Sequence, residues 1–129
     1  MQCNELMVGD WIADKHGFPM QVVSVSNDYL YADFEGNEGD VWEFNDKDNI
    51  PYPVLLTVEF FAKNAFDKKI LFWTEGNIIH EKDGSKGYII EIRPFPPPTG
   101  PGASVHYVHE VQQLLRLGGY TEIANNVKL

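Results

Sequence analysis

Short apolar and aromatic runs recur along the first 50 residues, and polar or glycine-containing turns separate them. The runs lie at 11–13, 20–25, 29–34 and 41–44, and an extended segment follows at 50–53. Short runs at spacings of about 8–12 residues, with no helical periodicity between them, are typical of antiparallel barrels. The pattern therefore predicts that this part of the chain is a small barrel of four or five strands.

The pattern changes after residue 53. Thr57 can cap a short helix that places Val58, Phe61, Ala62 and Ala65 on one face. Three strands are expected next, at 70–74, 78–80 and 88–92, followed by a proline-rich loop at 94–102. Segment 103–107 fits either a strand or the first turn of a helix. Apolar spacing predicts a helix over 108–117 that stops at Gly118-Gly119, and the remaining residues, 121–129, are expected to be a frayed tail or a short strand.

These elements predict an α+β protein with two domains. Domain 1–53 is an acidic, SH3-like small β-barrel. Domain 54–129 contains a short helix, a three- to four-stranded antiparallel sheet and a C-terminal helix. In the second domain we expect the two helices and the sheet to share a core that contains Phe61, Val108, Val111 and Leu115.

Charge is distributed unevenly between these two parts. Residues 1–53 contain eleven acidic residues and two lysines, whereas 54–129 contain eight acidic and eight basic residues, so the first part carries the whole net charge of −9. Nucleic-acid binding draws its sequence-independent affinity from Lys and Arg contacts to phosphates, so this charge argues against DNA or RNA as a partner. It favours a basic protein partner instead.

Other features limit the location and the chemistry of the chain. No apolar run approaches the length of a membrane span, and the N-terminal residues lack the pattern of a signal peptide. The single cysteine, Cys3, excludes an intrachain disulfide and has no neighbours that mark it as a nucleophile. We therefore expect a cytoplasmic protein without a cofactor, in which Cys3 is incidental.

Acidic residues are concentrated between the third and fourth predicted strands. Asp33, Glu35, Glu38 and Asp40 fail the spacing of a calcium-binding loop and are typical of a solvated acidic loop. We name these four residues the acidic rim and predict that, together with Trp42, they form the binding surface. The barrel aromatics fit either its core or a ligand-stacking face. They are Trp11, Tyr29, Tyr31, Phe34, Trp42 and Phe44.

A second candidate site lies at the start of the C-terminal helix. His106, His109 and Glu110 are ligand types that bind metals, and two histidines three positions apart on a helix can meet one ion. The order differs from the helical zinc motif, which needs two histidines four apart with a glutamate between them. The alternative interpretation places Glu110 at the positive end of the helix dipole, without a metal.

Three stretches resemble a family of short, uncharacterised proteins from gut Bacteroidetes and their phages or integrated elements. They are Glu5–Trp11, similar to L-x-x-G-D-W-V, Leu56–Phe66, similar to L-T-x-E…K-N-G-F, and Tyr107–Leu114, similar to Y-V-H-E-L-Q. Ala65 and Val111 depart from the family pattern, which has Gly and Leu there. The resemblance implies an origin in mobile or phage-derived DNA and implies no activity.

These observations indicate a non-catalytic protein-binding or adaptor module. Two other functions stay open at this point. One is a metal-dependent hydrolase that uses His106, His109 and Glu110. The other is an acidic decoy that mimics nucleic acid and occupies a DNA-binding protein.

Overall fold

The structure is a computed structural model, and it describes residues 1–34, 41–64, 66, 70–80, 85–92 and 103–129. The protein belongs to the α+β class, with antiparallel sheets and short helices. The chain forms two compact units, Met1–Val54 and Leu55–Leu129. The predicted turn at 83–84, the proline-rich loop at 94–102 and the helical position of Ala65 lie outside the described residues.

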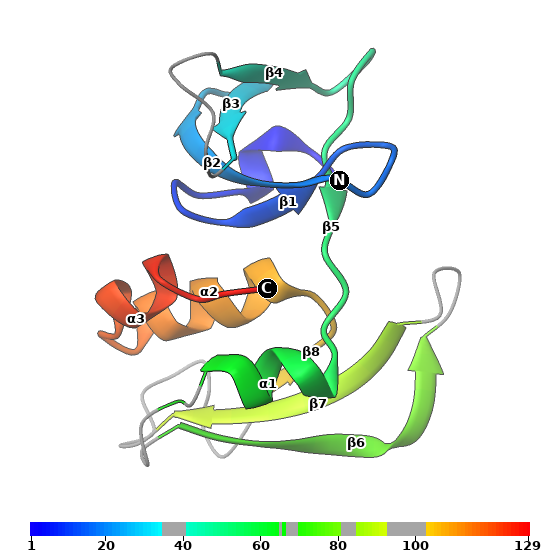
Figure 1. Cartoon of the computed structure of the whole chain (residues 1–129), viewed down its shortest axis with the longest axis vertical. Coiled ribbons are helices and arrows are strands. Elements are labelled where there is room, and N and C mark those ends of the chain that lie inside the picture. The colour runs from blue at the N-terminus through cyan, green and yellow to red at the C-terminus, as the bar shows by residue number, and fades with distance from the viewer. Residues whose placement is uncertain (35–40, 65, 67–69, 81–84, 93–102) are drawn as a thin grey trace. The chain divides into compact units, whose positions relative to one another are not determined.

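The N-terminal unit is a curled, five-stranded antiparallel sheet (Figure 1). Its elements are the 3-10 helix η1 (Cys3–Glu5) and strands β1 (Trp11–Ala13), β2 (Pro19–Val25), β3 (Tyr29–Asp33), β4 (Trp42–Asn45) and β5 (Tyr52–Pro53). The strand order is β4-β3-β2-β1-β5, so β1 to β4 form a meander and β5 returns to pair with β1. The four predicted strands are all present. The extended segment 50–53 contributes the fifth.

The core of this unit lies on one face of the sheet. Alternate strand positions point to the same face, so each strand contributes every second residue. The buried hydrophobic cluster consists of Cys3, Leu6, Ile12, Met20, Val22, Leu30, Ala32 and Phe44. Cys3 is therefore a core residue, a packing role that its place in the sequence does not predict. Its backbone N–H donates to Oδ1 of Asp46 at 2.8 Å and ties η1 to the end of β4.

The C-terminal unit combines a three-stranded antiparallel sheet with three helices (Figure 1). Its elements are α1 (Val58–Asn64), β6 (Ile70–His80), β7 (Ser85–Ile92), β8 (Ala103–Val105), α2 (Val108–Leu117) and α3 (Thr121–Asn125), and the strand order is β6-β7-β8. The expected cap of α1 is confirmed, because Oγ1 of Thr57 accepts from the N–H of Phe60 at 3.2 Å. The helix predicted over 108–117 is also confirmed.

The predicted core residues of this unit are buried. Phe61, Val108, Val111 and Leu115 are at most 3% exposed. The rings of Phe61 and Tyr88 lie 5.2 Å apart, which joins α1 to β7. The predicted face of α1 is wrong in part. Val58 is 60% exposed and Ala62 is exposed, and Phe60 is buried in their place.

The structure corrects two other expectations for this unit and decides one alternative that the sequence left open. Residues 70–80 form one strand whose pairing shifts between Thr74 and Ile79, so the expected turn at 75–77 is absent from it. Segment 103–107 begins as strand β8. Residues 121–125 form helix α3 rather than a tail or a strand, because Nε2 of Gln112 donates to the carbonyl of Ala124 at 3.0 Å and holds α3 against α2.

The C-terminal residues are also held in place. Lys128 donates its N–H to Oδ1 of Asn64 at 2.7 Å, and Nδ2 of Asn64 donates back to the carbonyl of Lys128 at 2.8 Å. Lys63 reaches the carbonyl of Leu129 at 2.9 Å. These bonds fasten the end of the chain to α1, which explains why a frayed tail is the wrong expectation.

Candidate functional site

One end of the N-terminal sheet carries a group of aromatic side chains and a carboxylate. Because neighbouring strands run antiparallel, the end of β1, the start of β2, the end of β3 and the start of β4 lie together. The position two residues beyond a core residue lies on the same face of the sheet. Four such pairs occur at this end: Ile12 and Asp14, Met20 and Phe18, Ala32 and Phe34, and Phe44 and Trp42. At this end of the sheet, the core face therefore carries three aromatic rings, those of Phe18, Phe34 and Trp42.

The strand register places Trp42 at this end of the core face. Val22 pairs with Ala32, and Ala32 pairs with Trp42, so the three side chains form one cross-strand row on the core face. Val22 and Ala32 are at most 2% exposed, whereas Trp42 is 52% exposed. Trp42 belongs to β4, which is an edge strand of the sheet that the described residues form. The predicted binding residue Trp42 thus lies at the open end of a core row.

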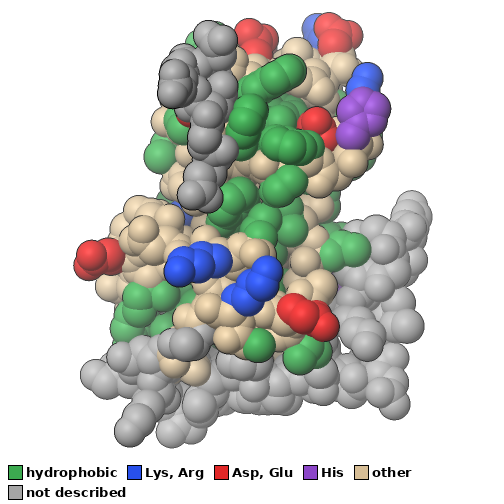
Figure 2. Space-filling model, viewed as in Figure 1, with side chains coloured by type: hydrophobic (Ala, Val, Ile, Leu, Met, Phe, Trp, Pro, Cys, Tyr) green, Lys and Arg blue, Asp and Glu red, His purple; other side chains and the backbone are tan. Residues whose placement is uncertain are grey.

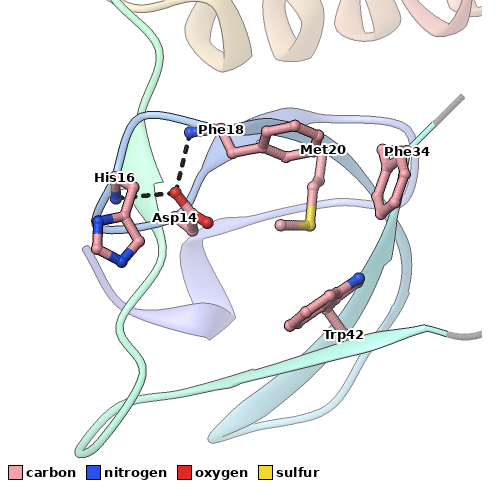
Figure 3. Close-up of a pocket in the computed structure, with 6 residues that line it drawn as sticks. All are labelled: Asp14, His16, Phe18, Met20, Phe34 and Trp42. Carbon is pink, nitrogen blue, oxygen red and sulfur yellow. Dashed lines mark hydrogen bonds between the residues drawn. The ribbon is translucent and has the colours of Figure 1, made fainter.

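These residues line a pocket of about 350 Å³, which we call the aromatic pocket (Figure 3). Its lining is Asp14, His16, Phe18, Met20, Phe34 and Trp42. Figure 3 shows the three aromatic rings around the Met20 side chain, with Asp14 and His16 on the side away from Phe34. Met20 is only 3% exposed and forms part of the core. Its thioether is therefore the floor of the pocket.

The rings of Phe18 and Phe34 form the best-defined wall. Their centroids lie 5.1 Å apart and their planes meet at 86°, which is an edge-to-face pair. Phe18 is 47% exposed. Figure 2 shows hydrophobic side chains gathered on the face of the N-terminal unit that this view presents, with acidic side chains near them. The unit therefore exposes apolar surface beside negative charge.

The Asp14 carboxylate is fixed by the turn between β1 and β2. Its Oδ1 accepts from the backbone N–H of His16 at 2.8 Å and of Phe18 at 2.9 Å. Gly17 has a φ of 83°, which glycine adopts without strain and which lets the turn close. The hydrogen bond from Phe18, followed by that from His16, lowers the pKa of Asp14 below its ordinary value. Asp14 is therefore negatively charged at neutral pH.

A second hollow, of about 380 Å³, lies on the other face of the sheet. It is lined by Trp11, Gln21, Val23, Asp33 and Phe34, and we call it the outer hollow. Trp11, Gln21 and Asp33 are successive cross-strand partners, so they share the face opposite the core. Phe34 contributes to both hollows. The structure therefore places Asp33 and Trp42, the two described members of the predicted binding surface, in adjacent hollows.

The structure refines several interpretations of this region that rest on the sequence. Glu35, Glu38 and Asp40 lie outside the described residues. Of the six barrel aromatics, only Phe44 is fully buried, so the core interpretation holds for Phe44 and fails for exposed Trp42 and Tyr29. The sequence pattern does not mark four of the lining residues as site residues: Asp14, His16, Phe18 and Met20. The signal that locates three of them is their position on the core face once the strands are paired.

The His106, His109 and Glu110 cluster has a structural role. Oε1 of Glu110 accepts from the backbone N–H of His106 at 2.8 Å and of Tyr107 at 2.9 Å, which caps the start of α2. His109 is 7% exposed, and its ring stacks on Tyr107 at 5.8 Å. Within the part of the chain that the structure describes, no three His, Cys, Asp or Glu side chains are grouped to hold a metal ion. The two hydrogen bonds agree with the interpretation that places Glu110 at the positive end of the helix dipole.

Comparison with protein families, curated proteins and solved structures gives no match for this chain. The resemblance to the Bacteroidetes family stays a prediction, because these comparisons do not bear on it. In the described ranges, no helix combines the length and the apolar character that crossing a membrane requires.

Proposed function

We propose that this chain is a non-catalytic protein-binding module whose N-terminal unit is an SH3-like barrel that binds a basic segment of a partner protein. The observation that carries the proposal is the aromatic pocket, which combines three aromatic rings with the fixed Asp14 carboxylate. Pockets with apolar walls and a few placed polar groups are the usual form of ligand sites. The SH3-like interpretation is supported by the meander of β1 to β4 and by the return of β5 to β1.

The charge of the N-terminal unit supports a basic partner. Eleven acidic residues and two lysines occur in residues 1–53, so a cationic segment is attracted and an anionic one is repelled. Such complementarity mainly increases the association rate and the specificity of a complex. The same charge disfavours nucleic acid, whose phosphates need basic side chains.

We place the contact surface at the acidic rim and the adjoining pocket. Asp33 lies in the outer hollow, and Phe34, the next residue, separates that hollow from the aromatic pocket. In the sequence, Glu35, Glu38 and Asp40 connect Phe34 to Trp42. The rim residues therefore lie next to two pocket residues, Phe34 and Trp42, in the sequence, which supports one contact surface for the rim and the pocket.

Binding of a lysine-rich peptide at two salt concentrations tests this proposal. The comparison is wild type against a rim variant that combines Asp33→Asn, Glu35→Gln, Glu38→Gln and Asp40→Asn. A control variant removes the same charge from exposed positions elsewhere in the unit, by Glu5→Gln, Asp28→Asn, Glu43→Gln and Asp48→Asn. We expect the rim variant to bind more weakly than the control and with a smaller salt dependence, because exposed charges are screened over about 10 Å at 0.1 M.

Two outcomes would contradict the proposal. If the rim variant binds as tightly as wild type with the same salt dependence, the rim is only a solvated surface. Submicromolar binding of duplex DNA at physiological salt would show that the electrostatic argument is wrong. Binding to a DNA-binding protein in competition with DNA, so that each displaces the other, would favour the decoy function instead.

A further inference from the structure

The walls of the aromatic pocket limit the chemistry of what it can hold. Four of the six lining residues that the structure describes, Phe18, Met20, Phe34 and Trp42, are apolar, and two of these are about half exposed. A ligand group that enters must therefore be apolar over most of its surface. The Phe18 and Phe34 rings stand nearly perpendicular, so they enclose a rounded group better than they stack on a flat one.

The charge of the pocket selects a cation. The face of an aromatic ring attracts a positive charge that lies within about 6 Å of its centre. Asp14 adds a full negative charge, and its position is set by two backbone hydrogen bonds. The pocket therefore attracts a cation through both its rings and its carboxylate, and it repels anions.

The hydrogen-bonding capacity of the pocket narrows the choice of cation. A guanidinium brings five N–H donors and an unmodified ammonium brings three. Among the described lining residues, the polar side chains are those of Asp14 and His16, and Oδ1 of Asp14 already accepts two backbone N–H groups. Most donors of arginine or lysine would face apolar walls without an acceptor, which is unfavourable. Each methyl group on an ammonium removes one donor and adds apolar surface.

We propose that the aromatic pocket binds a methylated ammonium group, with Trp42, Phe34 and Phe18 around the methyl groups and Asp14 opposite the charge. This group is carried either by a methylated lysine in a protein or by a small quaternary ammonium compound. The inference rests on the proposed function for its site, and it adds the chemistry of the group that the site selects.

The test is isothermal titration of the full chain with two matched pairs of probes. The first pair is choline and its neutral isostere, 3,3-dimethylbutanol. The second is a short peptide with one lysine, unmodified or trimethylated, and an arginine form of this peptide is included. We expect choline to bind at least about tenfold more tightly than the isostere, because the two differ in charge and not in shape. We expect the trimethylated peptide to exceed the lysine and arginine peptides by a similar factor.

Variants locate the binding site. Trp42→Ala should abolish measurable binding of the trimethylated peptide. Asp14→Asn keeps a carbonyl oxygen for the turn and removes only the charge, so it should weaken binding severalfold. Tyr29→Ala is the matched control, because Tyr29 is an exposed aromatic residue, 39% exposed, at the opposite end of β3 from Phe34. It should bind like wild type.

The outcomes separate this inference from the proposed function. Equal binding of choline and its isostere, or equal losses in Trp42→Ala and Tyr29→Ala, would overturn the inference. Equal binding of the unmodified and trimethylated peptides would also overturn it, and the basic-segment proposal would stand if the rim variant still lost affinity. Trimethyl-specific binding that the rim variant retains at all salt concentrations would support the pocket and contradict the basic-segment proposal. The relative affinities identify the molecule that carries the methylated ammonium group. It is a protein side chain if the trimethylated peptide binds more tightly than choline, and a small compound if it does not.

Discussion

The His106, His109 and Glu110 cluster and the aromatic pocket differ in how their residues are brought together. The cluster lies within residues 106–110, at the start of α2. There Glu110 accepts hydrogen bonds from two backbone N–H groups, and His109 packs on Tyr107. The pocket residues are spread from Asp14 to Trp42 and meet only through strand pairing. The histidine cluster therefore stabilises the start of its own helix. The pocket residues, which come from several strands, enclose a cavity instead.

The difference has a simple physical cause. The first backbone N–H groups of a helix have no partner within the helix, so a carboxylate near its start is drawn to them. Glu110 accepts hydrogen bonds from the N–H groups of His106 and Tyr107, which lie just before α2. At the end of a sheet, residues on the core face have fewer neighbouring side chains above them. Large side chains there therefore remain partly exposed. Trp42 is such a side chain.

The largest expected effect separates the core from the pocket on a single strand. Phe44 and Trp42 lie on the same face of β4, but Phe44 is 1% exposed and Trp42 is 52% exposed. Phe44→Ala should lower the free energy of unfolding of the N-terminal unit by about 3–5 kcal/mol. Trp42→Ala should cost less than about 1.5 kcal/mol, because half of its surface is already in water. Urea denaturation monitored by circular dichroism measures the free energy of unfolding of both variants. Equal losses of stability would mean that Trp42 is a core residue.

The next effect tests the helix that carries the histidine cluster. Leu115 is fully buried, and Leu115→Ala should destabilise the C-terminal unit by about 2–5 kcal/mol. Leu117, two residues further along α2, is 64% exposed and serves as the control. Leu117→Ala should change stability by no more than about 0.5 kcal/mol. A loss below about 1 kcal/mol for Leu115→Ala would mean that α2 is peripheral to this unit.

A smaller effect tests the role of Glu110 itself. Glu110→Ala removes the acceptor for the N–H groups of His106 and Tyr107, so it should cost about 0.5–2 kcal/mol. Glu110→Gln keeps a carbonyl acceptor and should cost less. Thermal unfolding of wild type with and without Zn²⁺ completes the test. A marked rise in melting temperature on adding the metal, lost in both variants, would restore the metal-site alternative.

The smallest effect on stability at neutral pH concerns the end of β4 that lies away from the pocket. Burial, followed by the nearby Asp46 carboxylate, raises the pKa of Cys3 from 9.0 to about 12. A raised pKa means that folding favours the protonated thiol, so this contribution is present below pH 9 and is lost as the pH rises toward 12. At pH 8.5, a thiol reagent should therefore label native protein far more slowly than protein in urea. Equal rates would show that Cys3 is accessible.

Sequence periodicity predicts most of the elements, but it misses η1 and helix α3 and divides β6 into two strands. The strands of the N-terminal unit and helix α2 follow from runs of apolar residues and from turn-forming residues between them. Helix α3 does not, because its five residues follow two glycines and it depends on the bond from Gln112 to Ala124. No local signal reports that contact.

The site is accessible from the sequence only in part. The composition around the acidic rim points to Trp42 and Asp33, and both lie in hollows. Asp14 and Phe18 belong to a turn and a strand start that carry no binding motif. Their place in the pocket depends on register, and β2 and β3 contain an irregularity between Val22 and Ser24 that shifts which residues face the core. A one-residue shift moves side chains to the other face, so pattern alone cannot assign them.

We propose that the aromatic pocket, and not the histidine cluster, is the functional site of this chain. Two-dimensional NMR of the ¹⁵N-labelled full chain, titrated with the trimethyl-lysine peptide, tests it most directly. We predict chemical-shift changes concentrated on the backbone amides of His16, Phe18, Phe34 and Trp42 and on the Trp42 indole N–H, with 106–110 unchanged. Changes centred on 106–110, or no changes up to millimolar peptide, would contradict the account.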